Sequence, residues 1–289
     1  MRQWVSQGMS QWRRQWVRRS LGVWLLGMML WLCCSGMAQA GVLADRLAAF
    51  PDWQSKPPLH PAQGDLAYPD WFAGTWTVTT TLIDLAAPLA PDLITPGFES
   101  NRPYLSQPIG FQARFVAESP RRGKNVPGLP LQVPSLQLST AQGRSPALIS
   151  DRAFNGLNLA KAYLDGSGKD GKSPVLAVKV DPSNPNRQIT LLRGDRQLVS
   201  TVSDRATESA NATEFITTEL FQQEFRGAPQ VYFNTVETTT AYTHHPAAHP
   251  TITADQVTAI YLSPQDPDYF KAGERPVALY RYRMEFEAG

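Results

Sequence analysis

The feature that most constrains the fold is a strict two-residue alternation that begins at the end of a turn rich in aromatic residues. The turn is YPDWFAGTW, residues 68–76, and the segment WTVTTTLIDL follows from residue 76. In this segment the even-numbered side chains form one face and the odd-numbered side chains form the other. A period of two is typical of a β-strand whose two faces meet different surroundings. The sequence therefore predicts a strand that begins at about Thr75.

Similar segments recur to the end of the chain, between loops rich in Pro, Gly and Ser at 86–109 and 118–146. Gly194 and Asp195 supply the positive φ angles that a tight hairpin needs between two of these segments. Asn155–Leu164 is the one interior segment whose pattern allows a short helix. The other predicted strands are 111–117, 147–154, 175–180, 188–193, 197–203, 215–225, 231–242, 256–262 and 277–286.

About ten mostly antiparallel strands with few helices predict a mainly β fold. Closure of such a sheet removes its exposed edges, so we expect a calycin- or lipocalin-like antiparallel β-barrel of about 8–10 strands, with long loops and few short helices. A β-sandwich is the alternative. Ahead of the barrel domain at 70–289, residues 41–69 are expected to form a short amphipathic helix, packed on the surface, and a Pro-rich linker.

Residues 1–40 have the pattern of a secretory signal peptide. Arginines precede an apolar run at 21–32, and MAQA follows, with Ala38 and Ala40 at the −3 and −1 positions of a cleavage site. The apolar run is shorter than the ~20 residues that span a bilayer, so we expect no transmembrane span after cleavage, and an uncleaved anchor is the alternative. Arg18-Arg19 partly matches a twin-arginine signal, so the Sec and Tat routes both stay open.

Cleavage after Ala40 changes the charge and the cysteine content. The whole chain has 27 Lys and Arg against 25 Asp and Glu, and five arginines and no acids lie in the leader. The mature chain therefore carries 22 basic and 25 acidic residues, a net charge of −3. This balance gives no electrostatic support for a nucleic-acid partner. Both cysteines, Cys33 and Cys34, also leave, which excludes a disulfide or thiol chemistry in the mature chain.

Gly74 and Trp76 form a Gly-x-Trp motif where the first strand begins. The glycine allows a sharp turn into the barrel, and the inward-pointing indole buries enough area to close one end. The last strand, VALYRYRMEF, carries Arg281 and Arg283, and a guanidinium is a good partner for an indole. Because the first and last strands of a closed barrel are neighbours, we expect these four residues to close the barrel. The arrangement resembles that of lipocalins, in which a first-strand Gly-x-Trp meets a late arginine.

A wider resemblance extends from about residue 68 to residue 286. It rests on the phrases PGFESNRPYL, DRAFNGLNLAKAYL, VDPSNPNRQITLLRGDRQL, FQQEFRG, VETTTAY and ADQVTAIYLSPQDPDYF. With them the chain resembles an uncharacterised cyanobacterial and plastid family of exported proteins, whose domain has no assigned function. The resemblance implies the thylakoid lumen or the periplasm as the location, and it transfers no catalytic residue.

Two motifs suggest chemistry without supporting it, and a third is absent. GSGKDGKS, residues 166–173, matches the phosphate-loop pattern, but the strand pattern VLAVKV follows where a helix is required. His244, His245 and His249 are weak candidates for a metal site, since Pro246 and Pro250 prevent a helix that would align them. No Gly-x-Ser-x-Gly elbow is present for nucleophilic catalysis.

Two predicted strands, TTELFQQEF at 217–225 and NTVETTTAY at 234–242, are unusually polar for a barrel core. One interpretation is that one face of each strand is in water. The alternative is that Glu219, Gln223, Asn234 and Glu237 line a wet cavity and bind a polar part of a ligand.

These patterns favour a non-catalytic exported protein that carries a small amphipathic molecule, such as a pigment, quinone or lipid, and no cofactor. The alternative function is that of an accessory or assembly factor, which binds a photosynthetic membrane complex through its loops. That function predicts an exposed apolar patch on one rim, for example at Phe98 and Tyr104. A buried carboxylate pair with strongly shifted pKa values would instead favour an enzyme.

Overall fold

The structure is a computed structural model of the whole chain, and it describes residues 41–95, 97–118, 146–165, 172–227 and 231–289. The expected signal peptide at 1–40 lies outside these residues. Residues 41–289 form one compact unit. No helix in the described part of the chain is long and apolar enough to cross a membrane. The helices are α2 (Val42–Ala48), α3 (Arg152–Leu164), α4 (Tyr269–Ala272) and the short 3-10 helices η1 (Asp70–Phe72) and η2 (Glu99–Tyr104).

Twelve strands form a single sheet in the described residues, and every pairing between named strands is antiparallel. The order across the sheet is β2-β5-β4-β3-β12-β11-β10-β9-β8-β7-β6, and β1 pairs with β8 beside this path. The strands are β1 (His60–Pro61), β2 (Ala67–Tyr68), β3 (Gly74–Ala86), β4 (Pro108–Ala117), β5 (Leu148–Ser150), β6 (Val175–Asp181), β7 (Asn184–Leu192), β8 (Arg196–Glu208), β9 (Glu214–Arg226), β10 (Tyr232–His244), β11 (Ile252–Leu262) and β12 (Ala278–Ala288).

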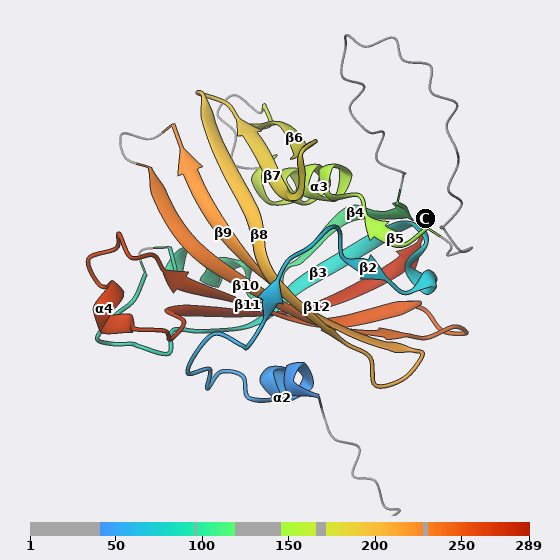
Figure 1. Cartoon of the computed structure of the whole chain (residues 1–289), viewed down its shortest axis with the longest axis horizontal. Coiled ribbons are helices and arrows are strands. Elements are labelled where there is room, and N and C mark those ends of the chain that lie inside the picture. The colour runs from blue at the N-terminus through green and yellow to red at the C-terminus, as the bar shows by residue number, and fades with distance from the viewer. Residues whose placement is uncertain (1–40, 96, 119–145, 166–171, 228–230) are drawn as a thin grey trace, which may run out of the picture. The chain divides into compact units, whose positions relative to one another are not determined.

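The sheet curls strongly into a half-barrel, which confirms the predicted mainly antiparallel β fold with few short helices (Figure 1). The predicted neighbourhood of the first long strand and the last strand is also confirmed, because β3 pairs with β12. The two ends of the strand order, β2 and β6, do not pair with each other among the described residues. Instead α3 packs against β4 on one side and against β6 and β7 on the other, so this helix fills the gap between the two edges.

Local sequence signals explain two of the connections. The hairpin between β7 and β8 turns at Gly194 and Asp195, whose φ angles are +75° and +55°, as predicted. The strand predicted over 147–154 is shorter than expected, since β5 ends at Ser150 and α3 begins at Arg152. The cause is a helix cap: the Asp151 side chain accepts a hydrogen bond from the Phe154 N–H at 3.1 Å.

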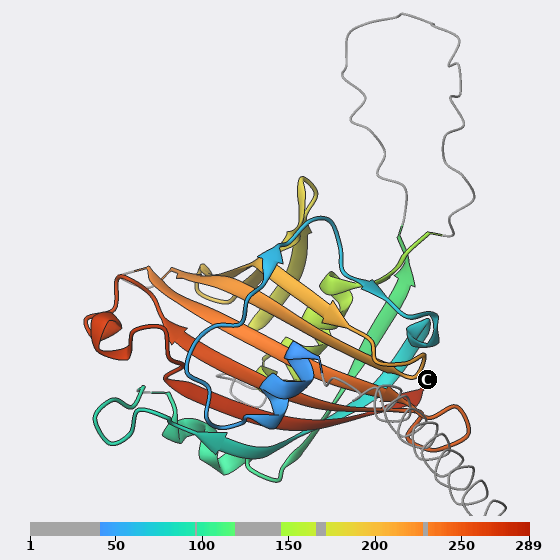
Figure 2. The same ribbon diagram turned by 60° about the horizontal axis from the view of Figure 1, so that its bottom comes forward.

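The segment before the barrel covers the convex face of the sheet. Helix α2 lies across β9 and β10 (Figure 2), and it buries Leu43 and Leu47. Leu47 and Trp53 pack with Val257 and other convex-face side chains of β11 and β12. The predicted surface helix is therefore present, and it gives the convex face an apolar layer of its own. The segment expected as a linker also contributes β1 and β2 to the sheet.

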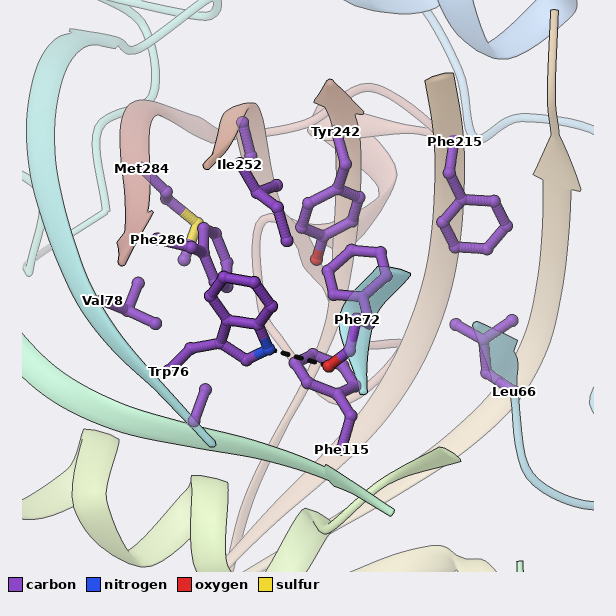
Figure 3. Packing of buried hydrophobic residues seen from close by; sticks show 12 residues of the cluster. Leu66, Phe72, Trp76, Val78, Phe115, Phe215, Tyr242, Ile252, Met284 and Phe286 are labelled. Atoms are coloured by element: carbon purple, nitrogen blue, oxygen red, sulfur yellow. Dashed lines mark hydrogen bonds between the residues drawn. The ribbon is translucent and has the colours of Figure 1, made fainter. Parts of the chain in front are cut away.

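The main core lies at one end of the concave face. We call it the aromatic plug; Figure 3 shows Trp76 and Phe72 at its centre. At the opposite end, side chains of α4 and of the loop between β3 and η2 pack over β3, β11 and β12. Both ends of the half-barrel are thus closed by apolar contacts. The plug consists of Leu66, Phe72, Trp76, Val78, Ala113, Phe115, Phe215, Tyr242, Ile252, Ala254, Met284 and Phe286.

Candidate functional site

The indole of Trp76 points into the aromatic plug and is 6% exposed. Gly74, at the turn before it, has a φ of +109°, and no heavy atom lies within 4 Å of a Cβ built there. The requirement for glycine is therefore conformational and not steric. The Trp76 Nε1–H donates a hydrogen bond of 2.7 Å to the carbonyl oxygen of Phe72, which belongs to the turn that precedes the strand.

The structure does not bring the expected arginines to this indole. In the register of β3 and β12, Ala288 lies opposite Trp76, whereas Arg281 and Arg283 lie opposite Asp84 and Thr81. Arg281 forms an ion pair with Asp255, and its guanidinium carbon lies 5.4 Å from the ring centroid of Phe50. Arg283 is exposed near Glu285. The expected indole–guanidinium contact is replaced by the Phe72 carbonyl, because the register puts both arginines farther along β3 and their odd-numbered positions face the convex side.

The concave face between the two closed ends is polar. Tyr242 belongs to the plug, and side chains two and four residues along the same strand, Thr240 and Thr238, share its face. The strand registers extend this face to β9, β11 and β12. The resulting polar band consists of Thr217, Thr238, Thr240, Gln256, Thr258 and Tyr282.

Solvent reaches part of this polar band, although Thr217 and Thr240 are buried. On β11 the convex-face residues Val257 and Ala259 are fully buried, whereas the concave-face residues Gln256 and Thr258 are half-buried. A barrel filled by its own side chains has the opposite pattern, with the inward face the drier one. The Thr217 hydroxyl is buried, and it has no hydrogen-bond partner in the described part of the chain. The middle of the half-barrel therefore presents polar groups that are partly accessible to a bound molecule.

An ion cluster borders the plug and the polar band. Glu219 Oε1 accepts hydrogen bonds from Arg152 of α3 at 2.7 Å and from Arg205 of β8 at 2.8 Å. Arg205 also donates to Asn186 Oδ1 at 2.6 Å, and Arg152 lies 3.9 Å from Asp65. Burial is the largest single effect on the pKa of Arg152 and lowers it, but Glu219, Tyr68 and Asp65 together raise this pKa overall. Two guanidinium groups and two carboxylates thus fasten α3, β8 and β9 together, with no excess charge.

Several phenols face the interior beside this cluster. Burial raises the pKa of Tyr68, and the nearby Tyr242 and Glu219 raise it further. Burial also raises the pKa of Tyr242 to about 12 and that of Tyr282 well above its ordinary value, the latter with a contribution from Tyr163 of α3. These hydroxyls stay protonated at neutral pH and can donate hydrogen bonds to a ligand.

We expect the protein to lose stability between pH 10 and about 12, partly through Tyr242. Its pKa rises from 10.0 to about 12 on folding, so the folded state holds this proton more tightly than the unfolded state does. Stability that is fully present below pH 10 is therefore lost as the pH rises through the folded-state pKa, by about 3 kcal/mol for this shift. Urea unfolding of the wild type and of Tyr242→Phe measures this. The variant should show a shallower decline, and an identical decline in both proteins would contradict the assignment.

The four predicted ligand-binding residues lie on two different faces of the sheet. Glu219, Gln223 and Asn234 belong to the concave face, with Glu219 held by the two arginines. Glu237 lies on the convex face beneath α2 and is 0% exposed. Its carboxylate accepts hydrogen bonds from Arg46, from the Tyr261 hydroxyl at 2.7 Å and from Thr239 at 3.0 Å. This carboxylate is fully occupied inside the protein, so Glu237 does not line the same cavity as the other three.

Sequence reasoning missed Arg46, Arg152, Arg205 and the interior tyrosines as parts of these sites. One signal was present: a glutamate within a strand that has a buried face needs a cation near it. Which arginine supplies the charge depends on contacts 191 residues apart along the chain for Arg46 and Glu237, and 67 for Arg152 and Glu219.

A family model described as "Domain of unknown function (DUF6816)" matches residues 60–288. The chain belongs to this family. The matched DUF6816 domain begins at β1 and ends within β12, so it contains the whole sheet, the polar band and the ion cluster, and it leaves α2 outside. No curated protein and no solved structure matches the chain.

The histidines of the DUF6816 domain have other contacts. The His244 ring stacks on Trp71 with centroids 5.1 Å apart, and His245 Nε2 lies 2.9 Å from the Thr253 hydroxyl. No group of three or more His, Cys, Asp or Glu side chains within the described ranges is arranged to hold a metal ion. Most of the phosphate-loop match, residues 166–171, lies outside the described residues. The strand expected after it is β6, where a phosphate loop would need a helix.

Proposed function

We propose that this protein is a non-catalytic exported binding protein, located in the thylakoid lumen or periplasm, that holds a small amphipathic molecule against the concave face of its half-barrel. A pigment, a quinone or a lipid has the required chemistry. The observation that carries the proposal is the reversed burial at 256–259 of β11, where the concave-face side chains are more accessible than the convex-face Val257 and Ala259.

The composition of the concave face supports an amphipathic ligand. Plug residues such as Met284 and the neighbouring Phe111 offer apolar contact at one end. The hydroxyls of the polar band and the amide of Gln256, which donates to Thr240 at 2.9 Å, offer hydrogen bonds in the middle. A site with apolar walls and a few polar groups that fix orientation is typical of small-molecule binding. The exported location is supported by the signal-peptide pattern at 1–40.

The proposal predicts a co-purifying molecule and a defined loss of binding. Native mass spectrometry of the protein exported from a cyanobacterial host should show a species heavier than the polypeptide. Gln256→Trp should weaken binding of decyl-plastoquinone at least tenfold, because the indole occupies the space in front of the polar band. Titration with this quinone, followed by tryptophan fluorescence, measures the change against a Gln222→Trp control on the exposed convex face of β9.

Equal affinity in the two tryptophan variants would contradict a concave-face site. Thermal unfolding of both variants shows whether the Gln256→Trp protein is folded. Absence of any added mass in the wild-type protein, together with no quinone binding, would contradict the carrier function itself without reference to a variant.

A second candidate, the accessory factor that binds a membrane complex through its loops, is favoured by one observation. Phe270 of α4 is 90% exposed, on the same rim as a depression of 470 Å³ that is lined in part by Val231 and Tyr232. The rim residue Tyr104 is also exposed, but Phe98 is 4% exposed and packs on Tyr280, so it is not part of such a patch. Two results together would favour this candidate. The exported protein would show no bound ligand by native mass spectrometry, and it would co-sediment with membranes unless Phe270 is replaced, as in Phe270→Ser.

A further inference from the structure

Glu208, at the end of β8, is placed to receive the start of the mature chain. Its Oε1 accepts a hydrogen bond of 2.8 Å from the Leu43 N–H in the first turn of α2. Its Oε2 is buried, and no hydrogen-bond partner for it is found within the described residues. A buried carboxylate oxygen without a partner is costly, because an ionised oxygen forfeits strong hydrogen bonds to water.

Gly41 lies directly against this carboxylate. A Cβ built on Gly41 would overlap Oε2 and would lie 2.5 Å from the carboxyl carbon of Glu208. The Cβ position and the α-nitrogen of a residue are both bonded to Cα and are about 2.5 Å apart, so the Gly41 nitrogen lies within about 5 Å of that carbon. A small rotation of the glutamate side chain or of the chain end is enough to bring the two groups into contact.

The sequence predicts cleavage between Ala40 and Gly41, which turns the Gly41 nitrogen from a peptide N–H into an α-amino group. An α-amino group has an ordinary pKa of roughly 8 and is charged at neutral pH. We propose that signal-peptide removal creates an ion pair between the Gly41 α-ammonium and Glu208, and that this pair locks α2 onto the convex face. The reaction is peptide-bond hydrolysis: water adds across the Ala40–Gly41 bond, Ala40 keeps the new carboxylate and Gly41 takes the protonated amine.

The lock has a consequence for the rest of the fold. Helix α2 carries Arg46, the cation that binds the fully buried Glu237. In the cleaved protein, the ion pair between the Gly41 α-ammonium and Glu208 holds the helix that supplies this cation. In the uncleaved precursor, the Gly41 nitrogen is part of a neutral peptide group and forms no such ion pair. The mature protein is therefore the form in which both carboxylates, Glu208 and Glu237, have a positive partner.

The test compares chains that begin at Gly41 with chains that keep Ala40, each with Glu208 and with Glu208→Gln. Glutamine keeps an acceptor for the Leu43 N–H and removes the charge. The chain that begins at Gly41 should have an unfolding equilibrium constant about tenfold smaller than the chain that keeps Ala40, and Glu208→Gln should abolish this difference, since a charge-assisted hydrogen bond is lost. Glu214→Gln, a matched substitution at the start of β9, should leave the difference unchanged.

A second measurement does not depend on stability. Acetylation of the α-amine by a succinimidyl ester at pH 7, followed by mass spectrometry, should be about tenfold slower at Gly41 than in the Glu208→Gln variant, because pairing keeps the amine protonated and covered. Equal unfolding constants and equal labelling rates in the four proteins would overturn the ion pair. The test proteins are produced with these N-termini and need no signal-peptide cleavage. A natural N-terminus other than Gly41 on the exported protein would therefore overturn only the proposal that signal-peptide removal creates the ion pair.

Discussion

The Arg46→Met variant is expected to unfold with a free energy lower than that of the wild type by about 3–5 kcal/mol, because it leaves a buried carboxylate without its cation. Glu237 is 0% exposed and Arg46 is only 12% exposed, so water cannot replace the lost guanidinium. Methionine keeps an aliphatic chain of similar length, but it also loses the guanidinium contact with the Trp53 ring, whose centroid lies 3.8 Å from the guanidinium carbon, and that loss is part of the expected cost. Urea unfolding at neutral pH measures the difference.

Two further proteins make this result specific. Arg102→Met removes an arginine from the ion pair with Glu99, in which the side chains are 56% and 60% exposed, and it should cost much less than Arg46→Met, because water and salt screen an exposed pair. Arg46→Met combined with Glu237→Leu removes both buried charges and should recover much of the lost stability. A cost for Arg46→Met that is no larger than that of Arg102→Met would show that Glu237 does not depend on α2 for its partner.

Trp76→Ala is expected to have an effect of similar size, about 3–5 kcal/mol, through a cavity in the aromatic plug. The indole lies with Phe286 in an edge-to-face arrangement at 6.5 Å and fills the centre of the cluster that closes one end of the half-barrel (Figure 3). The substitution also leaves the Phe72 carbonyl without its 2.7 Å donor. Chemical denaturation gives the change in free energy.

Trp71→Ala is the matched control for this substitution. Trp71 packs at the edge of the plug, is partly exposed and donates a longer hydrogen bond of 3.2 Å to the Ala212 carbonyl. Its loss should cost clearly less than the loss of Trp76. The cost of Trp76→Phe should lie between the costs of Trp76→Ala and Trp71→Ala, because an aromatic ring remains in the plug while the N–H donor is lost. Equal costs for the two alanine variants would contradict a central role of Trp76 in the plug.

The strands and the tight turn could be predicted from the sequence because they depend on neighbouring residues. The period of two in 76–85 indicates which side chains lie on each face of one strand. Gly194-Asp195 indicates the positive φ angles of one hairpin turn. The start of α3 was missed by three residues, because the Asp151 cap competes locally with the end of a strand. The four proposed ligand residues could not be assigned to one face, since β9 and β10 have polar side chains on both faces.

The sequence by itself determined a mainly antiparallel β fold, a sharp turn at Gly74, and an indole pointing inward at Trp76. Only the tertiary structure decided which groups meet: the Phe72 carbonyl lies at the indole, Arg281 pairs with Asp255, and Arg46 reaches Glu237. The physical reason is that alternation specifies the face of each side chain, whereas partners across strands depend on register and on chain segments brought together from far apart.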